Sequence, residues 1–73
     1  MRAKFTLNAM TEYPGHGGKT LRFNPVSDAS TPENERFTKY TPSGSLEMLV
    51  DNPAALAEMK LGQAYYLDFT PAP

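Results

Sequence analysis

The segment Arg2-Ala3-Lys4-Phe5-Thr6-Leu7-Asn8-Ala9 decides the fold class, because apolar and polar side chains alternate strictly along it. In an extended chain the apolar side chains would share one side and the polar ones the other. The apolar positions are Ala3, Phe5, Leu7 and Ala9. A period of two with one polar face predicts a half-buried β-strand. We expect the strand to end by residues 13–18, where a proline and three glycines interrupt a ladder.

Four further strands are expected downstream. The second covers Lys19–Asn24, with Leu21 and Phe23 facing inward. The third begins at about Glu35, because threonine and aromatic residues up to Tyr40 favour a strand, although Thr31-Pro32-Glu33 also fits the opening of one helical turn. Residues 41–44, Thr-Pro-Ser-Gly, fit a type I turn that would join strands three and four in a hairpin. The fourth and fifth strands are expected at Ser45–Asp51 and Gln63–Thr70.

One short helix is expected between the last two strands, over Asn52–Lys60. Asn52 fits the N-cap, Pro53 the first helical position, and Gly62 the left-handed stop. The order of elements predicts a mainly β single domain over residues 1–73. Its expected form is a five-stranded antiparallel barrel or strongly bent sheet, since closure removes exposed edges. The helix position favours an SH3-like barrel, with an OB-like barrel as the alternative.

Composition excludes several classes of function. The chain has 73 residues and no Cys, which excludes disulfides, thiolate zinc sites and cysteine nucleophiles. With a single His, we expect no metal and no cofactor. Seven Lys and Arg residues against eight Asp and Glu residues disfavour a strongly basic nucleic-acid binder. No apolar run approaches the roughly 20 residues of a membrane span, and the N-terminus has no signal-peptide apolar core. We therefore expect an intracellular domain with no membrane partner.

The glycine-rich loop after the first strand does not fit a known catalytic motif. Gly18-Lys19-Thr20 resembles the end of a phosphate loop, but Tyr13 stands where that motif needs its first glycine. His16 has no nucleophile and acid in a fixed position beside it. The sequence therefore predicts a protein that is not an enzyme. Tyr13, His16 and Lys19 remain candidates for contact with a partner, because loops often carry binding residues.

Basic residues are concentrated in the first 40 positions. Lys4, Arg22, Arg36 and Lys39 would form a modest basic patch if they share the outer strand faces, with Tyr40 nearby. Basic side chains interleaved with aromatic rings bind single-stranded nucleic acid or nucleotides by stacking. The same charges also suit pairing with the carboxylates or phosphates of another partner. A solvated polar face is the alternative interpretation.

Leu49 and Tyr66 are apolar residues at positions expected to face outward on neighbouring strands. Such a patch would suit self-association into a homo-oligomer, with a dimer as the simplest case. The alternative is a second minor core under the helix.

Three segments resemble a family of small, largely uncharacterised bacteriophage and prophage proteins. They are residues 35–48 (ERFTKYTPSGSLEM), 51–55 (DNPAA) and 61–71 (LGQAYYLDFTP). The shared features are an N-terminal strand, the TPSG turn, the DNPAA helix start and the G-x-x-Y-Y last strand, and the resemblance would cover most of the chain. These motifs are turn and cap signals, so they specify fold more than function. The resemblance supplies no catalytic residues.

The resemblance implies a phage accessory protein in the cytoplasm of an infected bacterial host. It would bind a host protein stoichiometrically and inhibit a host defence system. Alternatives are a binder of single-stranded nucleic acid or nucleotides, and a structural protein of the virion or its assembly. The candidate partner-binding residues are Tyr13, His16, Lys19, Arg22, Arg36, Lys39 and Tyr40.

Overall fold

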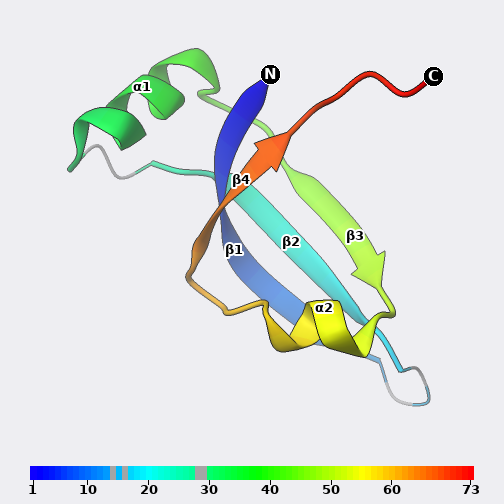
Figure 1. The fold of residues 1–73 in the computed structure, drawn as a ribbon. Helices are drawn as coiled ribbons and strands as arrows, with labels where there is room; N and C mark the ends of the chain where they lie inside the picture. The colour runs from blue at the N-terminus through cyan, green and yellow to red at the C-terminus, as the bar shows by residue number, and fades with distance from the viewer. Residues whose placement is uncertain (14, 16, 28–29) are drawn as a thin grey trace.

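The computed structural model describes residues 1–13, 15, 17–27 and 30–73. In chain order, the elements are β1 (Arg2–Glu12), β2 (Lys19–Pro25), α1 (Pro32–Tyr40), β3 (Leu46–Val50), α2 (Pro53–Ala57) and β4 (Ala64–Asp68). The mainly β class is confirmed. Figure 1 shows α1 at one end of the molecule, and the end of β1 with the start of β2 at the other.

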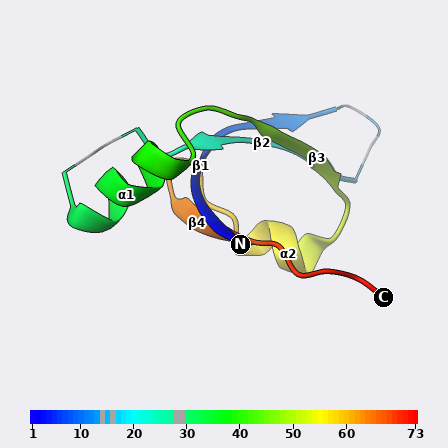
Figure 2. The ribbon, with the colours of Figure 1, turned by 90° about the horizontal axis from the view of Figure 1, so that it is seen from above.

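The strands form one open antiparallel sheet in the order β3-β2-β1-β4. The prediction of five strands is wrong for the described chain, which has four. The closed barrel is also not formed, because β3 and β4 are both edge strands. The sheet is nevertheless curved, and Figure 2 shows it bending around α2.

Residues 35–40 lie in a helix rather than in the predicted third strand. Thr31 caps α1, because its hydroxyl accepts a hydrogen bond from the Asn34 amide, and proline occupies the first turn. Glu33 and Glu35 lie near the positive end of the helix dipole, and Lys39 lies near the negative end. These end effects outweigh the weak β propensity of Thr38 and its aromatic neighbours. The helical opening seen at Thr31-Pro32-Glu33 is confirmed.

The predicted hairpin at residues 41–44 is wrong for the same reason. The segment leads from α1 into β3, and β3 pairs with β2, with Leu46 opposite Phe23. A turn signal specifies a change of direction but not which element precedes it.

A β-bulge interrupts β1 after Leu7. Leu7 lies opposite Phe23, whereas Ala9 lies opposite Arg22, so Asn8 is the extra residue. The bulge reverses the alternation, and Met10 rather than Ala9 shares the inner face with Leu21. The prediction that Ala9 faces the core is therefore wrong.

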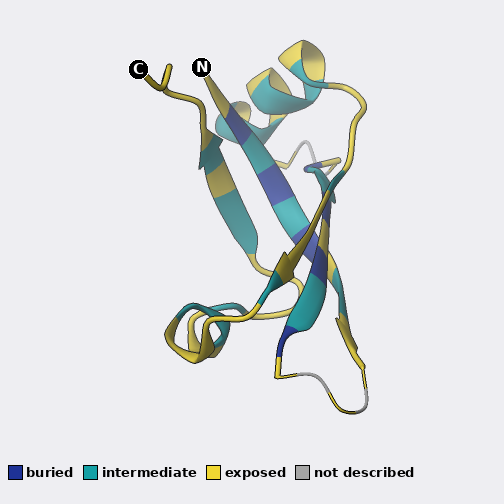
Figure 3. Cartoon of the chain, turned by 90° about the vertical axis from the view of Figure 1, so that its right-hand side faces the viewer, coloured by how far each residue is buried: buried dark blue, intermediate teal, exposed yellow. Residues whose placement is uncertain are grey.

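The core lies on the concave face of the sheet, between the strands and α2. Its buried members are Ala3, Phe5, Leu7, Leu21 and Phe23, all on the two central strands (Figure 3). Leu56 and Met59, in and just after α2, pack against this core. The predicted N-cap of this helix is confirmed, since the Asn52 side chain accepts hydrogen bonds from the Ala54 and Ala55 amides. Tyr65 holds β4 to the segment after α2, because its hydroxyl accepts from the Lys60 amide at 2.9 Å.

The molecule is more open than a compact protein of its size. Its accessible surface is 5387 Å², against about 4,500 Å² expected for a compact monomer of this mass. Its radius of gyration is 13.6 Å, against about 11 Å expected for this length. Neither helix and neither edge strand contains a buried residue. The chain therefore exposes about 900 Å² more surface than a compact monomer of the same mass would.

Candidate functional site

An open pocket of about 550 Å³ lies on the outer face of the sheet, beside α1. Three kinds of residue line it. Polar side chains come from the outward positions of the central strands and from α1. Small residues come from the turn before β4 and from its first position, and a short segment comes from the end of β2 and the two residues after it. They are Lys4, Thr6, Asn8, Asn24, Pro25, Val26, Ser27, Asn34, Gly62 and Ala64. We call this set the polar pocket. Its volume falls within the roughly 300–1,000 Å³ range of ligand sites.

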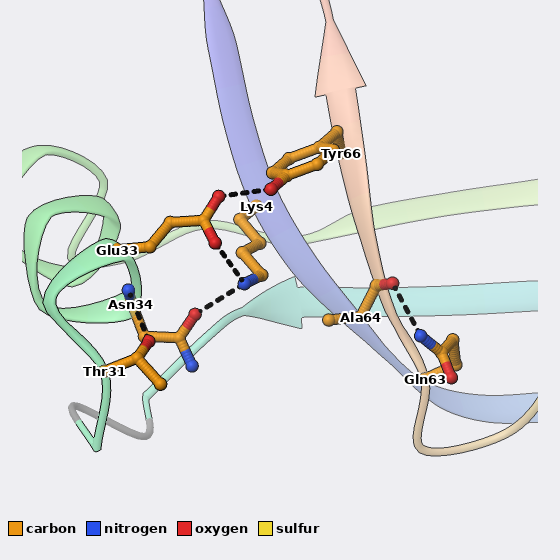
Figure 4. Close-up of polar contacts among 7 residues, drawn as sticks. All are labelled: Lys4, Thr31, Glu33, Asn34, Gln63, Ala64 and Tyr66. Atoms are coloured by element: carbon orange, nitrogen blue, oxygen red, sulfur yellow. Dashed lines mark hydrogen bonds and ion pairs between the residues drawn. The ribbon is translucent and has the colours of Figure 1, made fainter.

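Lys4 is the charged residue of the polar pocket. Its Nζ donates to Asn34 Oδ1 at 2.7 Å and lies 3.3 Å from Glu33 Oε2 (Figure 4). Only 17% of the Lys4 side chain is exposed, which is low for a lysine on a polar face. The two partners are on the first turn of α1, so the cap at Thr31 determines where the lysine is held.

Tyr66 extends this contact to β4. Its hydroxyl donates to Glu33 Oε1, and its ring lies against Phe37 of α1 with centroids 6.1 Å apart. The hydrogen bond from Tyr66, reinforced by Lys4, lowers the pKa of the Glu33 carboxyl below its ordinary value. The same hydrogen bond raises the pKa of the Tyr66 hydroxyl. Glu33 is therefore an ionised carboxylate that joins β1, α1 and β4.

A second ion pair flanks Tyr66 on β1 and β4. Arg2 Nε lies 2.6 Å from Asp68 Oδ1, and the Arg2 guanidinium lies 4.5 Å above the Tyr66 ring. The bidentate contact from Arg2 lowers the pKa of Asp68. These contacts fix the side chains at one end of the sheet's outer face.

The rest of the polar pocket is neutral. Asn8 Nδ2 donates to Asn24 Oδ1 at 2.7 Å, which joins the bulge residue of β1 to β2. Thr38 Oγ1 donates to the Val26 carbonyl at 2.8 Å and holds α1 to the end of β2. The pocket therefore offers amides, hydroxyls and one lysine in fixed positions. This set suits hydrogen bonding to a ligand. The neighbouring Glu33 carboxylate is not part of the pocket lining, and it is already paired with Lys4. Among the described residues there is no group of three or more His, Cys, Asp or Glu side chains that could hold a metal ion.

The structure separates the partner-binding residues predicted from the sequence. Tyr13 and Lys19 lie at the hairpin end, where Lys19 is 3.2 Å from Glu12. His16 lies outside the described residues. Arg22, on β2, is 3.1 Å from Glu47 of β3. The remaining three residues, Arg36, Lys39 and Tyr40, lie on α1 at the opposite end of the molecule (Figure 1).

Leu49 and Tyr66 are not neighbours, which corrects the predicted self-association patch. Leu49 lies on β3 and Tyr66 on β4, and these are the two opposite edges of the sheet. The error follows from the strand order, because β4 pairs with β1 rather than with β3. Tyr66 also contacts α1, whereas the Leu49 residue is 66% exposed.

Sequence reasoning singled out Lys4 but missed the neutral members of the polar pocket. Thr6, Asn8 and Asn24 occupy outward strand positions where charged residues are common. The sequence feature that could have indicated the pocket is this run of three uncharged hydrogen-bonding residues on two strands expected to be adjacent. The contribution of Asn34 required knowledge of α1, of which the sequence analysis offered only the opening turn as an alternative.

No family model matches the chain, and no curated protein or solved structure matches it at a significant level. The resemblance to phage proteins therefore stays a prediction from the quoted motifs. Within the described part of the chain, neither helix is long and apolar enough to cross a membrane.

Proposed function

We propose that this protein is a non-catalytic binding module whose recognition surface is the polar pocket and the adjoining face of α1. The observation that carries the proposal is the position of Lys4. A lysine with 17% of its side chain exposed is held between Asn34 and Glu33 at the pocket wall. A side chain fixed in this way loses little further conformational entropy when a ligand binds, which favours affinity.

The chemistry of the pocket indicates a polar segment of another protein as the ligand. An ammonium group has three donors, and Asn34 and Glu33 take two of those on Lys4, which leaves one for a partner oxygen. The amides and hydroxyls of Thr6, Asn8 and Asn24 suit backbone and carboxamide groups of a loop. Arg36 and Lys39 on α1 would add pairing with carboxylates at the rim.

The resemblance to phage proteins supports a more specific form of the proposal. The partner would be a protein of an infected bacterial host, bound stoichiometrically in the cytoplasm, and binding would block a defence component. A structural role in the virion is the alternative that uses the same surface with a phage protein as partner.

Nucleic-acid binding has weaker support. Four of the seven Lys and Arg residues, namely Arg2, Lys4, Lys19 and Arg22, lie within 3.3 Å of a carboxylate oxygen. Phosphates would have to displace those carboxylates, whereas strong nucleic-acid binders present unpaired cations. We therefore place protein binding first.

A pair of threonine variants tests the proposal. Thr6→Leu adds apolar volume to the polar pocket and removes a hydroxyl, while Thr11→Leu makes the same change on the outer face of the same strand, away from the pocket. Immobilised wild type and both variants are incubated with bacterial host lysate, and bound proteins are quantified by mass spectrometry. We expect one host protein at near-equal molar amount on the wild type and on Thr11→Leu, and at least a tenfold loss on Thr6→Leu.

Two results would contradict the proposal. One is that folded wild type retains no host protein at stoichiometric amount, and the other is that Thr6→Leu retains it as well as the wild type does. A labelled single-stranded oligonucleotide, tested at low salt, separates the nucleic-acid alternative. Tight binding that falls steeply as salt rises would favour that alternative over ours.

A further inference from the structure

β3 is an apolar edge strand, and among the described residues no lysine, proline, bulge or helix protects it against pairing. It reads Leu-Glu-Met-Leu-Val over residues 46–50, with one charge and no proline. Leu49 is 66% exposed and Met48 is 41% exposed. Natural edge strands are usually protected by lysines, prolines, bulges or a covering helix. At the other edge, α1 contacts the outward side chain of Tyr66 at the centre of β4.

The free edge of β3 presents the backbone groups of Glu47 and Leu49. The Val26 amide donates to the Lys4 carbonyl, so the backbone groups of even-numbered β2 residues point toward β1. Those of residues 21 and 23 therefore point toward β3, where they meet residues 48 and 46. The residues between, Glu47 and Leu49, direct their N–H and C=O groups away from the sheet.

Charge selects one register for antiparallel pairing of β3 with its own copy. Residues 46, 48 and 50 carry the inner-face side chains, so only registers that match inner face to inner face extend the core. Three short-offset registers meet this condition. One places Glu47 opposite Glu47 of the second copy, and another places Glu47 opposite Asp51; like charges directly opposite are destabilising. The third is centred on Met48, places Glu47 opposite Leu49 and brings no like charges face to face.

The chain as a whole exposes more surface than a compact protein of its size, so area is available for an interface. A stable protein interface of standard size buries about 800 Å² on each partner. The chain exposes 5387 Å², which exceeds the compact expectation by about 900 Å². The inner-face residues Leu46 and Val50, partly buried in the single chain, would extend the core into the second copy.

We propose that the protein forms a twofold-symmetric dimer in which β3 pairs antiparallel with β3 of a second copy, centred on Met48. The dimer contains one continuous sheet of eight strands, four from each copy. A twofold axis perpendicular to the sheet keeps the outer faces on the same side, so both polar pockets face one direction. The dimer uses a different surface from the polar pocket. The dimer proposal can therefore be wrong while the proposed function is right.

Two substitutions at one position test the pairing. Leu49→Glu places a carboxylate opposite Glu47 of the second copy, whereas Leu49→Lys places an ammonium there. The position is exposed in the single chain, so neither change should prevent folding. Sedimentation equilibrium should give about twice the 8.1 kDa chain mass for the wild type and for Leu49→Lys. Leu49→Glu should raise the dimer dissociation constant roughly tenfold or more. A wild type that stays monomeric up to millimolar concentration overturns the proposal, as does an unweakened dimer in Leu49→Glu.

Cysteine crosslinking tests the register, because the natural chain contains no Cys. In the proposed register Met48 faces its own copy in a non-hydrogen-bonded pair about 4.5 Å apart, within the range for a disulfide. Met48→Cys should therefore form a crosslinked dimer under mild oxidation. Leu46→Cys, whose two copies would lie about 13 Å apart, should not. Efficient crosslinking of Glu47→Cys or Leu49→Cys instead would overturn the register.

Discussion

Gly18 lies where the hairpin loop enters β2, and replacing it with alanine should destabilise the edge of the sheet. A Cβ at this position would lie 2.7 Å from the carbonyl oxygen of Val50, where ordinary contacts begin at 3.4 Å. The carbonyl belongs to the backbone of β3, opposite Lys19, so relief requires about 0.7 Å of movement in the β2–β3 ladder.

The size of the effect follows from three contributions. Overpacking against a fixed backbone costs about 1–3 kcal/mol, and weakening one ladder hydrogen bond costs about 1 kcal/mol. The reduced freedom of alanine in the unfolded chain offsets about 0.4–1 kcal/mol. We expect a net loss of about 1–3 kcal/mol in the free energy of unfolding, out of about 4–11 kcal/mol for a chain of 73 residues.

Urea unfolding followed by circular dichroism, at one fixed protein concentration, measures this loss. With a denaturant slope of about 1 kcal/mol/M, the midpoint should fall by roughly 1–3 M. Gly17→Ala is the matched control, because its nearest contact is the movable Asp51 carboxylate at 3.3 Å. Its midpoint should stay within about 0.5 M of the wild type. Equal midpoints for the wild type and Gly18→Ala would refute the assigned packing of β3 against the hairpin.

Three other substitutions have defined outcomes. Leu7→Ala, at a position with no exposed surface, should lower the free energy of unfolding by about 2–5 kcal/mol in the same urea assay; a loss below about 1 kcal/mol would place Leu7 outside the core. Thr31→Ala removes the cap of α1 and should cost about 0.5–2 kcal/mol, with unchanged stability counting against the cap. Glu33→Gln should reduce the loss of stability in acid. The pKa of Glu33 is lower in the folded chain, so its contribution is present above the unfolded pKa and disappears as the pH falls through the folded pKa. Between about pH 5 and about pH 3 the wild-type urea midpoint should therefore fall further than that of Glu33→Gln, and parallel curves would contradict this.

Most elements could be predicted from local sequence, because hydrophobic periodicity and capping residues each involve only a few neighbouring positions. The alternation around Phe5 predicts β1, and Asn52-Pro53 predicts the start of α2. Residues 35–40 carried two conflicting signals, the threonine and aromatic content of a strand and the cap and end charges of a helix. The helix formed because the cap satisfies a backbone donor at its first turn. The β propensity of residues 35–40 is too weak to outweigh this.

Features that depend on distant pairing were not predictable. The bulge at Asn8 could not be detected in the sequence. Ala9 and Met10 are both apolar, so either one could continue the alternating pattern of inward-facing residues. The strand order, which places Leu49 and Tyr66 on opposite edges, depends on β4 pairing with β1 rather than with β3. The polar pocket needs β1, β2, α1 and the start of β4 together, so only its outward strand residues were visible in the sequence.

The pairing of β1 with β4 has a consequence for synthesis on the ribosome. Arg2 and Asp68 lie side by side although 66 positions separate them in the chain. At a translation rate of roughly 5–20 residues per second, β4 is made about 3–13 s after β1. During that interval Ala3 and Phe5 lack the strand beside them, while the β1–β2 hairpin can already form. The nascent chain therefore presents a half-built apolar surface to chaperones until its final strand emerges.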